Sequence, residues 1–216
     1  MGTVPVPAFS EFIGNFDLGP SSCEDTGLCT LTYDFKYKDP KGLEWQANAK
    51  NTTDGASIPP WTQPIIGKPF DPSYIKAAVI HDHYCVRQVR PWRDTHRVFY
   101  DALLELGIDL AKAKLMYYAV YLGGPKWVEL MPGKSCGTSA CINSIKTGQK
   151  IMQSRPAEYD RAGFREELQE VEKLLIQSKG SVSLSDLEKR AQGKRPNDFY
   201  YTNGPRVTTL TGLPTE

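Results

Sequence analysis

Hydrophobic and polar positions alternate strictly at two places near the start of the chain. The first is TLTYDFKY, residues 30–37, and the second is residues 43–49. A period of two is typical of a strand with one buried face. The turn-forming sequence Asp39-Pro40-Lys41-Gly42 separates the two stretches. We therefore expect a β-hairpin over residues 30–49. Its buried face is expected to carry Leu31, Tyr33, Phe35, Tyr37, Leu43, Trp45, Ala47 and Ala49.

Residues 51–72, NTTDGASIPPWTQPIIGKPFDP, interrupt this alternation. Their Gly, Pro and Thr content predicts a long, irregular loop that proline stiffens. A loop longer than about 12–15 residues is usually functional or disordered. Apolar side chains such as Trp61 and Phe70 argue against disorder, which favours a functional loop.

The apolar spacing then becomes that of helices. Asp71-Pro72 combines an N-cap residue with proline at the first helical position, and predicts a helix that ends near Val86. A second helix is predicted from about Arg93 to Leu106. A third is predicted over 110–122, where Gly123-Gly124 ends it. Short connections between such helices predict a compact antiparallel array.

The pattern weakens after Trp127. Residues 132–150 are rich in Gly, Ser and Lys and predict a loop, whereas residues 157–178 predict a long charged helix. A short helix is expected after Ser185, and residues 193–216 are expected to form an extended tail.

Together these elements predict an α+β fold, with a β-hairpin or small antiparallel sheet packed on a three-helix array and a helical C-terminal extension. We expect a core domain over residues 1–130, and residues 131–216 as an appendage that is not an independent domain. Of the 216 residues, 40% are hydrophobic and 11% are aromatic, which suits a globular core rather than disorder.

The charge balance excludes some partners. With Lys+Arg 26 against Asp+Glu 25, no global field attracts nucleic acid or an anionic membrane, and we expect no nucleic-acid partner. No apolar stretch approaches the ~20 residues of a spanning helix, so no transmembrane segment is expected. The N-terminal sequence MGTVPVPAFSEF also lacks the charged and apolar regions of a signal peptide.

The five cysteines form two close pairs and one single residue. Cys23 and Cys29, and likewise Cys136 and Cys141, lie in segments rich in small residues. Neither pair has the two-residue gap of a zinc knuckle. Two small disulfide-closed loops are expected, which favours a secreted or periplasmic location. Short loops of this kind also hold reduced thiols, so a cytoplasmic location stays open. Cys85, in an apolar helical context, is interpreted as a small buried hydrophobe.

All three histidines lie within a short segment: His81, His83 and His96, with Asp82 among them. Burying such groups costs several kcal/mol unless they pair or bind a metal. If the first helix ends near Val86, His81 lies ~7.5 Å before that end, and His96 lies ~4.5 Å inside the next helix. In an antiparallel pair these two side chains meet. His83 points away and is interpreted as a hydrogen-bonded core histidine.

Two chemistries suit this arrangement. In the first, His81, His96 and a carboxylate from Asp82 or Asp54 bind a divalent ion, with zinc favoured and a position open for water. In the second, His81 is a general base and Asp82 holds calcium. The sequence HDHYC resembles the His-Asp helix of secreted phospholipase A2, although that family has Asp where His96 stands, and no glycine-rich calcium loop precedes. The alternative to both is a structural hydrogen-bond network.

The segment TDGASIP, residues 53–59, adds two candidate catalytic residues, Asp54 and Ser57. An Asp-Gly turn followed by Ser and Pro directs its polar groups to one side. The alternative role is structural: the Asp and Ser side chains form hydrogen bonds with the backbone of their own loop. No GxSxG sequence surrounds Ser57, which argues against a Ser-His-Asp hydrolase.

Three motifs, TDGASIPPW, YIKAAVIHDHYC and VFYDALLELG, occur in this order and together resemble a family numbered 1353 among the domains of unknown function. That family is widespread in bacteriophages and bacterial genomes, and the resemblance covers about residues 30–127. It implies functional positions at Asp54, Ser57, His81, Asp82 and His96. The family more often has Asp at the position of His96, which is compatible with a metal-ligand or histidine-orienting role.

These observations predict a metal-assisted hydrolase in which a bound water is activated and Asp54 or Asp82 accepts its proton. Phage association and the expected disulfides suggest a substrate in the bacterial envelope, with peptidoglycan peptides ahead of phospholipid. A phospholipase A2-like hydrolase and a non-enzymatic phage-associated or secreted interaction module are the alternatives. An immunity or carrier protein stays open as a partner, because the sequence does not identify one.

Overall fold

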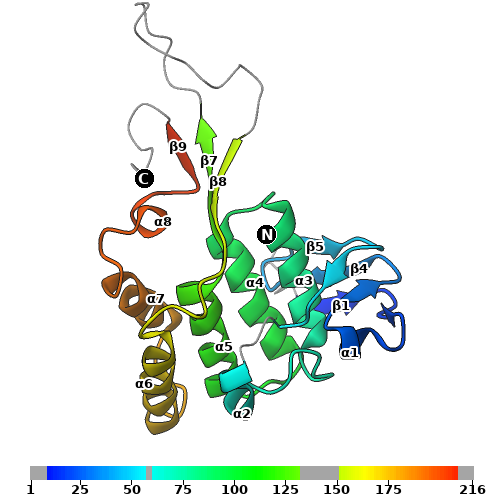
Figure 1. Cartoon of the computed structure of the whole chain (residues 1–216), viewed down its shortest axis with the longest axis horizontal. Coiled ribbons are helices and arrows are strands. Elements are labelled where there is room, and N and C mark those ends of the chain that lie inside the picture. The colour runs from blue at the N-terminus through cyan, green and yellow to red at the C-terminus, as the bar shows by residue number, and fades with distance from the viewer. Residues whose placement is uncertain (1–8, 57–59, 132–150, 209–216) are drawn as a thin grey trace, which may run out of the picture.

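Three helices form the centre of the molecule, with short strands on one side and C-terminal helices on the other (Figure 1). The computed structural model describes residues 9–56, 60–131 and 151–208. The central helices are α3 (Ile75–Arg87), α4 (Trp92–Glu105) and α5 (Leu110–Gly123). Their combination with small sheets confirms the predicted α+β fold.

The helix α5 occupies the middle of the core. Asp109 begins it by accepting hydrogen bonds from the backbone N–H groups of Ala111 and Lys112. Every residue from Ala113 to Gly123 is buried. A helix that is buried all round must be covered from several directions. It packs against α4, α6 (Phe164–Gln177) and α7 (Leu184–Gly193).

Two three-stranded antiparallel sheets precede the helices. One has the order β1 (Glu11–Ile13), β4 (Phe35–Lys38), β5 (Glu44–Ala47), and the other β2 (Leu18–Gly19), β3 (Cys29–Leu31), β6 (Thr52–Thr53). The predicted turn joins β4 to β5, and its Asp39 carboxylate accepts hydrogen bonds from the Leu43 N–H and the Trp45 indole. This half of the predicted hairpin is confirmed.

The expected single strand over residues 30–37 is wrong, because it is divided between the two sheets. The chain leaves β3 after Leu31 and enters β4 at Phe35, and Asp34 between them accepts a hydrogen bond from Ala49 N–H. Tyr33 therefore points outward and is 51% exposed. Leu43, expected inside, lies in the turn and is 48% exposed.

The described parts of the segment 51–72 are more regular than predicted. They contain β6, a 3₁₀ turn at Pro60–Thr62 and the short helix α2 (Gln63–Ile66). Asp71 does not cap α3: its carboxylate accepts hydrogen bonds from the N–H and hydroxyl of Ser73, and the helix begins at Ile75. The end of α3 and the bounds of α4 and α5 agree with prediction to within one or two residues.

A third sheet, in the order β8 (Ile151–Arg155), β7 (Lys126–Met131), β9 (Arg206–Thr208), was not predicted. It extends from the C-terminal end of α5 (Figure 1). The chain after α7 forms the short helix α8 (Phe199–Thr202) and β9, so the prediction of an extended tail is wrong there. The long helix α6 begins at Phe164 rather than at 157.

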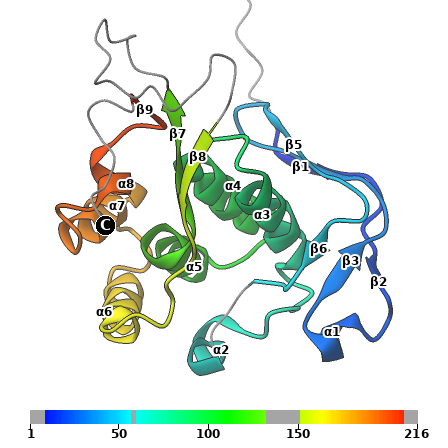
Figure 2. The same cartoon turned by 45° about the horizontal axis from the view of Figure 1, so that its top comes forward.

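The C-terminal helices share one apolar core with the three central helices. Phe164, Leu168 and Leu187 belong to the same cluster of buried side chains as residues of α3, α4 and α5. Figure 2 shows α6 and α7 alongside α5, opposite the N-terminal strands and α1 (Cys23–Thr26).

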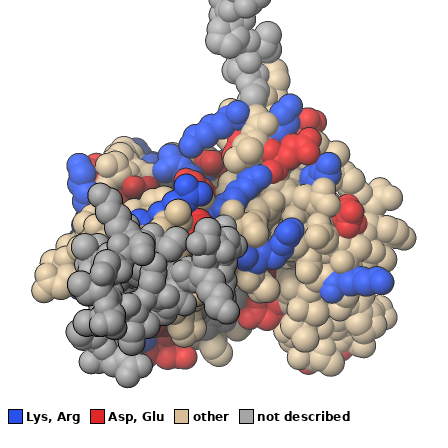
Figure 3. Space-filling model, turned by 90° about the horizontal axis from the view of Figure 1, so that it is seen from above, with Lys and Arg blue, Asp and Glu red and all other residues tan. Residues whose placement is uncertain are grey.

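Charged side chains of both signs lie beside one another on the face seen from above in Figure 3. Within residues 9–56, 60–131 and 151–208, no helix combines the length and apolar character needed to cross a membrane.

Candidate metal centre

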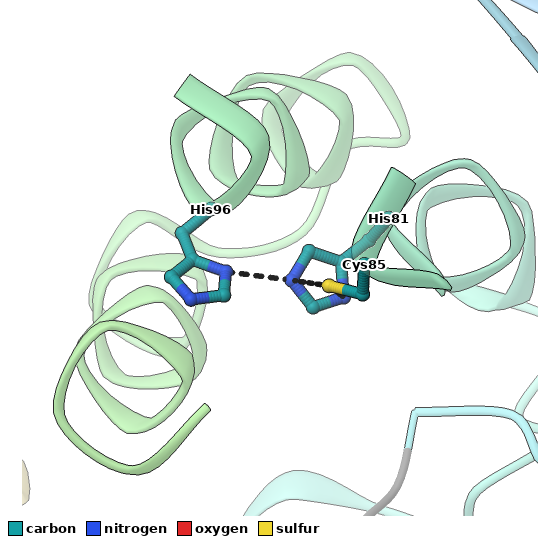
Figure 4. A group of neighbouring side chains, drawn as sticks. All are labelled: His81, Cys85 and His96. Carbon is teal, nitrogen blue, oxygen red and sulfur yellow. Dashed lines mark hydrogen bonds between the residues drawn. The ribbon is translucent and has the colours of Figure 1, made fainter. Parts of the chain in front are cut away.

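His81 and His96 meet across the α3–α4 interface, as the spacing predicted. The Nε2 atom of His81 lies 2.8 Å from Nδ1 of His96, and both rings are buried. His81 lies in the second half of α3, and His96 lies in the first half of α4, so the short connection between the helices brings them to the same level. Figure 4 shows the two rings pointing toward one another.

Hydrogen bonding assigns the proton of His96. Its Nε2 lies 3.1 Å from the backbone carbonyl oxygen of Pro125, which only accepts, so Nε2 carries the proton. Burial, with the charges of His81 and Lys126, holds the pKa of His96 well below its ordinary value. The ring is therefore neutral, and its Nδ1 presents a lone pair to His81.

The other nitrogen of His81 faces a carboxylate. Asp82 Oδ1 lies 3.6 Å from His81 Nδ1, which is an electrostatic contact longer than a hydrogen bond. The second carboxylate oxygen of Asp82 accepts a hydrogen bond of 2.6 Å from the Thr53 hydroxyl. Burial raises the pKa of Asp82, and the interaction with His81 and the hydrogen bond from Thr53 oppose that shift. This contact favours a proton on Nδ1 of His81, and therefore a lone pair on Nε2.

The 2.8 Å separation of the two ring nitrogens suits two arrangements. In one, Nε2 of His81 carries the proton and donates a hydrogen bond to Nδ1 of His96. In the other, both nitrogens are unprotonated and a divalent metal ion binds to them.

Cys85 is a further candidate ligand that the sequence interpretation missed. Its Sγ lies 3.5 Å from Nε2 of His81, one helical turn further along α3. The ligand atoms of His81, Cys85 and His96 all lie within 4.8 Å of one another (Figure 4). The spacing of four residues between His81 and Cys85, which places both on one helix face, was the signal available in the sequence.

A cavity of about 380 Å³ opens beside this group. His81, Asp82 and Cys85 line it on one side, and Asp54 and Tyr159 lie elsewhere on its wall. A second cavity of about 800 Å³ shares Asp54 and Tyr159 with the first. Asp54 and His81 therefore line the same cavity, whereas His96 is fully buried and does not line it.

The other residues singled out in the sequence have varied positions. Ser57 lies outside the described residues, as do Cys136 and Cys141. Cys23 and Cys29 form a disulfide, as predicted. His83 is buried away from the cavity, between Asn51 and Arg87, and burial together with the Arg87 charge lowers its pKa to about 4.

A glycine allows the carbonyl of Pro125 to reach His96. A Cβ atom on Gly124 would lie 2.3 Å from the Val120 carbonyl oxygen and 3.1 Å from Cε1 of His96. Gly123-Gly124, interpreted from the sequence as the end of a helix, therefore also lets the chain pass close to the site.

About half of this chain is similar to known proteins. An uncharacterized protein, y4iH, of Sinorhizobium fredii (strain NBRC 101917 / NGR234) is 54% identical over 113 residues, which are 52% of this chain and 47% of that protein. A second uncharacterized protein of the same organism, y4jT, is 43% identical over 122 residues, 55% of this chain and 36% of that protein. The match therefore covers less than half of each relative. No solved structure matches the chain significantly.

The family model that matches covers residues 29–120 and is described as a protein of unknown function (DUF1353). The matched segment contains His81, Cys85 and His96 and most of the cavity wall, whereas Pro125 and Tyr159 lie after it. The segment from residue 29 to residue 120, which carries the candidate metal ligands, is thus similar to the DUF1353 family.

Proposed function

We propose that this protein is a metal-dependent hydrolase in which His81 and His96 hold a zinc ion. The observation that carries the proposal is the pair of histidine ring nitrogens 2.8 Å apart, beside a cavity lined by carboxylates. Ligands that leave a coordination position open to a cavity are typical of catalytic zinc rather than of structural zinc.

The surrounding side chains suit the activation of water. A metal ion lowers the pKa of its bound water to about 7, so that a nearby carboxylate suffices to accept the proton. Asp54 and Asp82 both line the cavity, and Asp82 is anchored by the Thr53 hydroxyl. Asp82 also orients His81 through Nδ1, as carboxylates beside metal-binding histidines commonly do. Asp54 and Asp82 are thus the two candidates to accept the proton of the bound water.

The substrate we propose is a component of the bacterial envelope, with a peptidoglycan peptide preferred. The Cys23–Cys29 disulfide supports an oxidising compartment, secreted or periplasmic. The two cavities that share Asp54 and Tyr159 offer room for an extended chain rather than for a small molecule alone.

The test compares His81→Ala and His96→Ala with His83→Ala, which removes a buried histidine outside the pair. Zinc binding to the native chain is measured by calorimetry, and turnover is measured on purified peptidoglycan and on phospholipid vesicles. We expect one zinc ion per chain for the wild type and for His83→Ala. Zinc at 100 times its Kd should stabilise these two proteins by about 2.7 kcal/mol. The variants His81→Ala and His96→Ala should lose both zinc binding and turnover.

Some outcomes would contradict the proposal. If zinc binds but neither substrate is turned over, the proposal of a hydrolase that acts on the bacterial envelope is wrong. If zinc does not bind and both paired-histidine variants melt much lower than His83→Ala, the histidines have a structural role, and a non-enzymatic interaction module is the better assignment.

A further inference from the structure

We infer that Cys85 is a third metal ligand, through its thiolate, so that the site has a His-Cys-His ligand set and selects a thiophilic ion. This inference rests on the metal site proposed above and adds a third ligand, which explains why the site would prefer zinc. The ligand set predicted from the sequence had a carboxylate in this place.

All three ligand atoms lie within 4.8 Å of one another, and two of their separations can be compared with those around a single ion. In a tetrahedral zinc site, two nitrogen ligands lie about 3.3 Å apart, and a nitrogen and a sulfur ligand lie about 3.6 Å apart. The sulfur of Cys85 and Nε2 of His81 are 3.5 Å apart, already at this separation. The two histidine nitrogens, at 2.8 Å, would have to separate by about half an ångström.

The three ligands also differ in whether they line the cavity. His96 is fully buried, whereas Cys85 and His81 line the cavity, so an ion enters from the cavity and a fourth position stays on that side. Asp82 is less suited to be the third ligand, because one of its oxygens is taken by Thr53 and the other lies near Nδ1, the far nitrogen of His81.

The chemistry of the sulfur decides which ion is bound. Metal binding converts the Cys85 thiol to a thiolate and releases one proton, which leaves through the cavity to solvent. Calcium and magnesium prefer oxygen ligands, whereas zinc and cobalt accept a mixed nitrogen and sulfur set. A thiolate at this position therefore favours zinc over calcium, and argues against the calcium-dependent lipase chemistry that the HDHYC sequence suggested.

Cobalt(II) titration tests the inference without reference to turnover. A cobalt–thiolate bond gives a charge-transfer absorption in the near ultraviolet that nitrogen and oxygen ligands do not give. We expect this band in the wild type and in His83→Ala, and its loss in Cys85→Ser and His96→Ala. Zinc affinity of Cys85→Ser should fall by more than the roughly 10–100-fold that loss of an outer hydrogen-bond partner costs.

A labelling measurement covers the case in which Cys85→Ser does not fold. Zinc should protect Cys85 of the native wild-type chain from alkylation, and calcium at the same concentration should not. Cobalt or zinc binding with no charge-transfer band and no protection would overturn the inference and leave the histidine site in place. A band and protection without hydrolysis would support the inference while contradicting the proposed function. Absence of binding would overturn both the inference and the metal site.

Discussion

At the scale of single residues, the orientation of His96 depends on the backbone that follows α5. The Pro125 carbonyl accepts the Nε2–H of His96, and this leaves Nδ1 free to face His81. The carbonyl reaches this position because Gly124 has no side chain to collide with Val120. The chemistry of one histidine is thus set by a neighbour that carries no functional group.

Replacing Gly124 by alanine should therefore damage the site. The added methyl group meets the Val120 carbonyl and the His96 ring, and overpacking of this kind typically costs about 1–3 kcal/mol. We expect a lower melting temperature and weaker zinc binding in Gly124→Ala. The matched control is Gly193→Ala, whose new methyl group meets no atom within 4 Å at the end of α7. Equal zinc affinity in the two variants would contradict the role assigned to Gly124.

At the scale of helices and strands, α6 and α7 are joined to α5 by a buried carboxylate. Glu167 in α6 accepts hydrogen bonds of 2.6 Å from the Tyr118 hydroxyl in α5 and from Nε of Arg190 in α7, and it pairs with Lys194. Burial alone would raise the pKa of Glu167, but the hydrogen bonds from Arg190, Lys194 and Tyr118 outweigh it and lower the pKa. The ionised form therefore holds three helices together.

This contact predicts how stability depends on pH. Because the pKa of Glu167 is lowered by folding, its contribution is present above about pH 4.3, the ordinary pKa of Glu, and is lost as the pH falls through the lowered value. Glu167→Gln should cost about 1–3 kcal/mol at neutral pH. The difference from wild type in urea unfolding should shrink in acid. Glu166→Gln, at an exposed neighbouring position, should change little at any pH.

The central helices could be predicted from sequence because their signals are local. Asp109 caps α5 within three residues, and the periodicity of α4 needs no partner. The sheet β8-β7-β9 depends on pairing between distant segments, and β7 is largely buried, so no alternation marks it. Tyr33 was misplaced because alternation continues across the point where the chain changes sheets.

The candidate site was predictable to a similar extent. The contact between His81 and His96 followed from helix spacing, because both helices end or begin near the same turn. Cys85 was overlooked, since cysteine in an apolar helix is usually a packing residue. Pro125 and Tyr159 could not be found, because a backbone carbonyl and a distant aromatic leave no pattern in the sequence.

At the scale of the whole molecule, covalent and packing constraints act at different places. The disulfide Cys23–Cys29 closes a short loop between α1 and β3, at the edge of the fold. The helices α6 and α7, by contrast, complete the core around α5. Residues far along the chain are thus needed to bury the helix at the centre.

The state of the thiols can be measured directly. Alkylation of the unfolded chain without reductant, followed by mass spectrometry, should label one cysteine, Cys85, if Cys136 and Cys141 are bonded as the sequence predicts. The physical reason is the short separation within each pair, which makes closure of the loop easy. Three labelled cysteines would contradict the second disulfide, and five would also contradict the bond between Cys23 and Cys29.

Tyr159 lies on the wall of both cavities, yet it comes from a part of the chain beyond the segment shared with the family. One part of the cavity wall is therefore encoded outside the stretch that carries the histidines and most of the wall. A substitution at Tyr159 changes the surface offered to a ligand and leaves His81, Cys85 and His96 in place. Ligand selectivity at this cavity is thus partly separable from the histidine pair.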